Sequence, residues 1–74
     1  MKVPKLTVVM ERSEKWFVAT CPELDVVSQG KSPGEARKNL AEAVELFLDC
    51  ATEKEIRRRL SRKVTVEPLE LAHA

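Results

Sequence analysis

SPGEARKNLAEAVELFLDC, residues 32–50, is the stretch that decides the fold, because it predicts one amphipathic helix. Ser32 is placed to be the N-cap, Pro33 occupies the first helical position, and Glu35 completes a capping box. Apolar residues then recur at spacings of mostly three and four, which places them on one stripe of a helix. Such a helix must cover another element, and the candidate is a sheet built from the flanking segments. The stripe consists of Ala36, Leu40, Ala43, Val44, Phe47 and Ala51, with Leu48 at one edge.

The segments before this helix predict three strands, because β-branched and aromatic residues gather between short polar breaks. A three-residue break after the first strand predicts a hairpin, and Pro22 ends the second strand because it cannot donate to a ladder. Gly30, expected at positive φ, separates the third strand from the helix. The strands are placed at residues 5–12, 16–21 and 26–29.

The segments after this helix predict a short helix and a last strand. Thr52 reads as the cap of a helix over 53–61, which is supported by two i, i+4 ion pairs, Glu53–Arg57 and Glu55–Arg59. Residues 63–71 alternate like a strand that either extends the sheet or pairs with another subunit, and Pro68 predicts an edge strand or a bulge. The fold class is therefore α+β, with an antiparallel sheet, one long helix packed on a face and the order β-β-β-α-(α)-β.

The composition describes one small domain over residues 1–74, whose core is marginal for its length. Charged residues make up 34% of the chain and the net charge is +1, which does not favour a general nucleic-acid binder. No stretch approaches the roughly 20 apolar residues of a membrane helix. Without a secretory signal, Cys21 and Cys50 are expected to be reduced, buried thiols in a cytoplasmic protein.

Several stretches, read in order, resemble the HicB antitoxin family. The first is LTVVMER in the first strand, and the aromatic pair Trp16-Phe17 follows before Val18-Ala19. The turn CPEL and the segment SQG come next, then the helix start S-x-x-E-A and its body N-L-x-E-A-x-E-L-F-L. The resemblance covers about residues 5–49, and it is carried by the order and spacing of motifs that are each weak alone.

The resemblance implies a truncated ribonuclease-H-like core and a non-catalytic function. Family members bind a small HicA-like toxin, which has a double-stranded-RNA-binding fold and cleaves messenger RNA, and they hold it inactive. Where the family often continues with Pro-Gly and a Cys, Asp25-Val26-Val27 stands here, so the turn departs from the family's pattern. Many members also carry a C-terminal DNA-binding domain. Residues after Leu71 leave no room for one, so direct DNA binding is not expected.

Two sets of residues are candidates for protein contacts. The sole tryptophan and the turn after the second strand are expected to contact a partner, because tryptophan is enriched in interface hot spots. Apolar residues beyond those needed for a one-sided helix indicate a second apolar surface, which predicts a homodimer or higher homo-oligomer. The partner set is Trp16, Glu23, Leu24 and Asp25. The oligomer set is Val9, Phe17, Leu46 and Leu48.

The remaining acidic, metal-binding and basic residues are interpreted as serving the fold rather than catalysis or ligand binding. Two-metal nuclease chemistry needs converging carboxylates, and the available acids are interpreted as solvated surface groups or, for Glu35, a cap partner. A zinc site is not expected, because Cys21, Cys50 and His73 lack recognisable ligand spacing. The basic cluster over residues 57–63 is interpreted as an ion-paired helix, with an acidic or RNA-associated partner as the alternative. An orphan homo-oligomeric module and a small nuclease or RNA-binding protein are the other functions considered. The candidate acids are Glu11, Glu23, Asp25 and Glu35.

Overall fold

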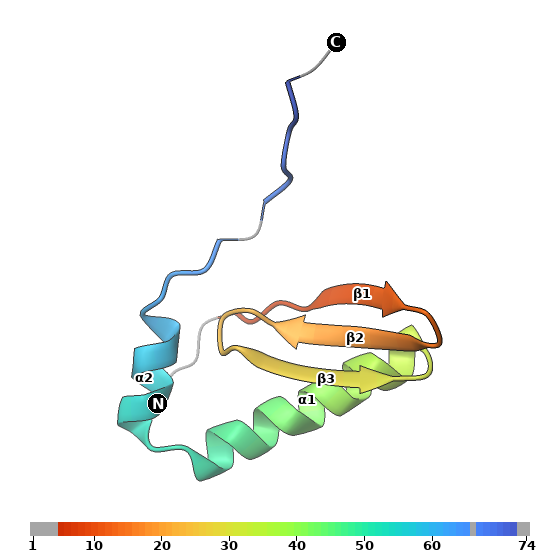
Figure 1. The fold of residues 1–74 in the computed structure, drawn as a ribbon. Helices are drawn as coiled ribbons and strands as arrows, with labels where there is room; N and C mark the ends of the chain where they lie inside the picture. The colour runs from red at the N-terminus through yellow and green to blue at the C-terminus, as the bar shows by residue number, and fades with distance from the viewer. Residues whose placement is uncertain (1–4, 66, 73–74) are drawn as a thin grey trace.

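The computed structural model describes residues 5–65 and 67–72, and it shows a three-stranded sheet followed by two helices (Figure 1). The longer helix lies across one face of the sheet, so the predicted α+β class is confirmed. The ribonuclease-H-like detail stays a prediction. The elements are β1 (Val9–Ser13), β2 (Trp16–Cys21), β3 (Val26–Gly30), α1 (Pro33–Cys50) and α2 (Glu53–Leu60).

The sheet has the order β1-β2-β3 with both pairs antiparallel, which confirms the predicted hairpin after the first strand and the predicted antiparallel sheet. The first hairpin turns at Glu14, which adopts a positive φ of 45°. β1 begins at Val9 rather than at Lys5, because Val9 already pairs with Thr20 and β2 ends at the next residue, Cys21. Residues 5–8 therefore have no neighbouring strand, and Thr7 instead bonds to the Glu23 carboxylate.

Both helices are capped as predicted. The Ser32 hydroxyl accepts from the Glu35 amide at 3.1 Å, and the Thr52 hydroxyl accepts from the Glu55 amide at 3.1 Å. α1 packs on β3 and β2. The core under α1 gathers small residues of the sheet against the predicted stripe, because a chain of this size has little interior to fill. Its buried residues are Ala19, Cys21, Leu24, Ala36 and Leu40.

The prediction of a positive φ at Gly30 was wrong, because neither glycine has a positive φ. Gly30 is required for a different reason. A Cβ built there would lie 2.5 Å from the Ala36 amide nitrogen and 2.8 Å from the Glu35 carbonyl carbon. The absence of a side chain therefore lets β3 approach the first turn of α1.

Two further predictions were wrong. Cys50 is exposed, because it is the last residue of α1, where the helix has run past the sheet (Figure 1). The last strand does not form among residues 63–65 and 67–71, which lie outside regular structure, and Val66 is outside the described residues. Instead, the C-terminal segment runs away from the sheet as an extended chain (Figure 1). Pro68 lacks a donor for a ladder, and none of the strands that the structure describes lies beside the segment.

Candidate protein-binding surface

No element among residues 5–65 and 67–72 covers the face of the sheet opposite α1, here called the uncovered sheet face. In adjacent antiparallel strands, paired residues point to the same face, and neighbours along a strand alternate. Because Ala19 and Cys21 are buried under α1, the alternate residues of β2, which are Trp16, Val18 and Thr20, belong to the uncovered face. The register places three rows there: Val9–Thr20–Val27, Glu11–Val18–Gln29 and Ser13–Trp16.

Apolar side chains are exposed on this uncovered sheet face. Val9 is 42% exposed, Trp16 41% and Val27 57%, while Val18 and Thr20 between them are half-buried. An antiparallel sheet with one solvated face ordinarily shows polar residues there. Exposed apolar residues that gather on one surface mark contact sites for other proteins. Glu11 is the charged member of the three rows, so the face combines an apolar surface with one carboxylate.

The turn between β2 and β3 is tied into the fold rather than free to bind. The Glu23 carboxylate accepts from the Thr7 amide at 3.0 Å and from the Thr7 hydroxyl, and the Cys21 thiol donates to it at 3.5 Å. Burial raises the pKa of Glu23, but the two hydrogen bonds from Thr7 outweigh it, so the pKa lies below its usual value. Burial, together with the adjacent carboxylate, raises the pKa of the Cys21 thiol. Glu23 therefore fastens the segment before β1 to the turn.

The predicted partner residues do not form one surface. Leu24 is fully buried and belongs to the core, whereas Asp25 is exposed with a positive φ of 57°. Trp16 begins β2 and the turn follows its end, so the two lie a full strand apart at roughly 3.3 Å per residue. Partner contact by Trp16 on the uncovered sheet face remains a prediction, and so does a separate contact by Glu23 and Asp25.

Sequence reasoning missed that α2 clamps this turn. The Arg59 guanidinium donates to the Leu24 carbonyl at 2.7 Å and lies 4.4 Å above the centre of the Phe47 ring. Arg62 donates to the Pro22 carbonyl at 2.8 Å. The basic cluster is the signal that the sequence offers. Its acceptors are main-chain carbonyls some 35 residues earlier, and main-chain acceptors cannot be predicted from a pattern of side chains.

The three arginines of the basic cluster that lie on α2 pair with acids of the same helix. Arg57 pairs with Glu53, and both Arg58 and Arg59 pair with Glu55, so the two predicted i, i+4 pairs are confirmed. The bonds from Arg58 and Arg59 lower the pKa of Glu55. These pairs reduce the positive charge that the cluster presents, and RNA binding by it stays a prediction.

The residues of the predicted oligomer surface are also dispersed. Val9 lies on the uncovered sheet face, and Phe17 lies on the opposite face, half-buried against the core. Leu46 and Leu48 are two positions apart on α1, so they point about 200° apart, to opposite flanks of the helix. Leu46 is 64% exposed, while Leu48 packs against the core. One apolar surface through all four does not exist, although each exposed member remains a candidate contact.

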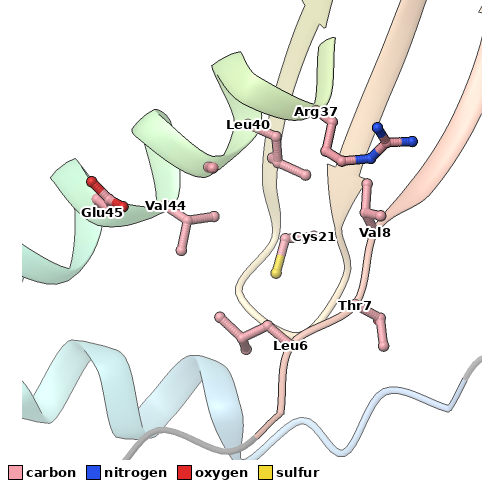
Figure 2. Close-up of a pocket in the computed structure, with 9 residues that line it drawn as sticks. Leu6, Thr7, Val8, Cys21, Arg37, Leu40, Val44 and Glu45 are labelled. Carbon is pink, nitrogen blue, oxygen red and sulfur yellow. The ribbon is translucent and has the colours of Figure 1, made fainter. Parts of the chain in front are cut away.

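An apolar groove of about 320 Å³, here called the edge groove, opens between α1 and the segment that precedes β1 (Figure 2). Leu40 and Val44 of α1 form one wall and Leu6 and Val8 form the other, with Cys21 between them (Figure 2). Arg37 and Glu45 are the charged groups of the lining. The complete lining is Leu6, Thr7, Val8, Cys21, Arg37, Leu40, Ala41, Val44 and Glu45.

The candidate catalytic and metal residues are not brought together. Glu11 lies on the uncovered sheet face and Glu23 in the turn beyond β2, while Glu35 accepts from the Lys31 amide at 3.2 Å beside the cap of α1. Among the described residues, no three acidic, cysteine or histidine side chains gather as a metal site would require. His73 lies outside the described residues. Within the same part of the chain, neither helix has the length and apolar composition of a membrane span.

Fold and surface together define a class: a small α+β protein with one sheet face left uncovered and partly apolar. The chain is 36% identical over 70 residues to a UPF0150 protein of Helicobacter pylori strain J99. The aligned residues cover 93% of this chain and 97% of the relative. The chain belongs to the UPF0150 family. No protein-family model matches it, and no solved structure matches it significantly.

Proposed function

We propose that this protein is a HicB-like antitoxin, which binds a small RNA-cleaving toxin and keeps it from its substrate without catalysis of its own. The observation that carries the proposal is the uncovered sheet face, where Val9, Trp16 and Val27 expose apolar surface on three adjacent strands. The order of motifs from LTVVMER to N-L-x-E-A-x-E-L-F-L, which resembles that family, supplies the identity of the partner.

The uncovered sheet face suits inhibition by masking. A sheet backed by α1 is a rigid platform, so little conformational entropy is lost when a partner binds it. A tryptophan half-exposed at one end of the face can serve as an anchor in a partner's pocket, and the valines supply flat contact area. A toxin whose RNA-binding surface is buried on this platform would be unable to bind messenger RNA. This mechanism requires no carboxylate cluster or metal in the antitoxin.

The test is a pull-down from native extract with a tagged copy, followed by an RNA-cleavage assay of whatever small protein co-purifies. We expect a stoichiometric partner that cleaves messenger RNA once it is stripped free and stops when the chain is added back. Val27→Glu, which places a charge in the middle of the uncovered sheet face, should weaken capture at least tenfold. Leu46→Glu changes an equally exposed apolar residue on the flank of α1, and it should leave capture unchanged.

Two results would contradict the proposal. One is recovery of the chain alone from extract, and the other is a partner whose RNA cleavage is not affected by the chain. Recovery of the chain alone would favour the second candidate, a homo-oligomeric binding module of the same fold. The exposed apolar residues of the C-terminal segment are the observation that favours that candidate.

A further inference from the structure

The edge groove lacks a wall on its outer side. β1 is an outer strand of the sheet, and α1 packs chiefly over β3 and β2, so the side of the sheet at β1 is left open. The lining between Leu6, Val8, Leu40 and Val44 is apolar (Figure 2). An apolar cavity of about 150 Å³ already accommodates a benzene ring. The 320 Å³ of the edge groove is therefore enough for two leucine side chains.

The same chain exposes a segment with the complementary pattern. Residues 67–72, here called the tail, are extended, with Leu69 86% exposed and Leu71 70% exposed. In an extended chain, alternate residues point the same way, so both leucines share one side. Glu67 and Glu70 add negative charge to the tail, while Arg37 at the edge groove pairs with no carboxylate in the part of the chain that the structure describes.

The end of α2 directs the tail away from its own sheet. The Ser61 amide bonds to the Arg57 carbonyl at 2.9 Å, and Arg62 is held by the Pro22 carbonyl. Lys63 then adopts a positive φ of 51°. The tail therefore runs away from the sheet of its own chain, which leaves it free to reach a second copy (Figure 1).

We propose that the tail of one copy binds in the edge groove of a second copy, where it adds a strand beside β1 and inserts Leu69 and Leu71 between residues 6–8 and α1. The unpaired edge of β1 supplies main-chain donors and acceptors, as in other cases of strand addition. Arg37 of the receiving copy attracts the tail carboxylates. The exchange is reciprocal in a two-fold dimer, so both tails and both grooves are used.

The primary test is sedimentation of the full-length chain over a range of concentrations. We expect a reversible dimer. The double change Leu69→Asp/Leu71→Asp should raise its dissociation constant at least a hundredfold, because each buried leucine contributes more than a factor of ten. These changes lie in an exposed segment, so the fold should be preserved, which circular dichroism checks. Leu46→Asp alters an exposed leucine of the predicted oligomer surface that lies outside the edge groove. Tail exchange requires that this change leave the dissociation constant unaltered, and loss of the dimer in this variant would overturn the proposal.

Complementation distinguishes tail exchange from other dimers. Ala41→Glu puts a charge in the edge groove at an exposed helical position and should also give monomers. A mixture of the Ala41→Glu chain with the Leu69→Asp/Leu71→Asp chain has one intact tail and one intact groove, so it should form heterodimers.

The proposal would be overturned by a wild-type monomer at all concentrations or by a dimer that survives the tail changes. If the dimer survives the tail changes but is lost in Val27→Glu, its interface lies on the uncovered sheet face instead. The proposal does not depend on the toxin, because no partner protein enters either measurement.

Discussion

Gly30 lies at a close approach of β3 to the first turn of α1. It is buried, and the space that a side chain would need is filled by the main chain of Glu35 and Ala36. Main-chain atoms at a capped helix start cannot swing aside as the end of a flexible side chain can. The requirement for glycine here is therefore steric and concerns distance between elements rather than backbone dihedral angles.

Gly30→Ala should lower the free energy of unfolding by about 2 kcal/mol or more, because the helix must move away from the strand to admit a methyl group. Gly34→Ala is the matched control, since nothing lies within 4 Å of a Cβ at that position. The control should be neutral or stabilising by up to about 1 kcal/mol, as alanine favours the helix. Urea denaturation measures the free energy of unfolding of both variants. Equal stability of the two would contradict the steric explanation.

Glu23 makes the stability of the fold depend on acid. Its carboxyl is a stronger acid in the folded chain than in the unfolded chain, where the pKa is near 4.5, because Thr7 bonds to the ionised form. Ionisation therefore favours the folded state. That contribution is present above pH 4.5 and is lost as the pH falls through the lower pKa of the folded protein.

We expect Glu23→Gln to be less stable than the wild type at neutral pH and to lose less stability on acidification. Thr7→Val removes the hydroxyl donor to Glu23, so this variant should also lose less stability on acidification than the wild type. Urea midpoints measured from about pH 7 down to about pH 3 provide the comparison. Parallel pH profiles for wild type and Glu23→Gln would show that this carboxylate does not link folding to protons.

At the scale of elements, α2 acts as a clamp on the turn between β2 and β3. It is short and mostly charged, and Ile56 is its buried residue, so little apolar burial holds it in place. Arg59 makes up for this with three kinds of contact: a carbonyl of the turn, the ring of Phe47 and the carboxylate of Glu55. A guanidinium suits this position because it can stack and donate at once.

Arg59→Ala should destabilise the fold by about 1–2 kcal/mol, through loss of the stacking on Phe47 and of the bond to the Leu24 carbonyl. Arg57→Ala removes a solvent-exposed pair on the same helix and should change stability by only a few tenths of a kcal/mol. Thermal unfolding of both variants provides the measurement. If the two variants unfold together, α2 is not a clamp.

At the scale of the whole molecule, the chain buries little apolar surface for the number of residues that it orders. Six hydrophobic residues among those described are buried, and eight large ones are exposed. A chain of this length is marginal by itself, because only about 60% of its unfolded surface is buried. The uncovered sheet face and the tail with its edge groove are two separate places where association would add burial. The first serves the proposed toxin contact and the second the proposed dimer, so both can be occupied in one assembly.

The local sequence determined the elements of this protein. The caps at Ser32 and Thr52, the stripe from Ala36 to Phe47 and the ion pairs of α2 depend on residues within four positions of one another. Hydrogen bonds and side-chain contacts at such spacings are built into helix geometry, so a linear pattern reveals them. The three strands followed for the same reason, since alternation is local.

Only the tertiary structure decided what lies between the elements. The bond from Thr7 to Glu23, the approach of Gly30 to α1 and the grip of Arg59 on the Leu24 carbonyl join parts of the chain that local patterns do not relate. The tertiary structure also separated residues that the sequence had grouped, such as Trp16 from the turn and Leu46 from Leu48. The last strand was predicted from its alternation, but a strand needs a neighbour to pair with. Whether one lies alongside depends on distances in space, which no local pattern encodes.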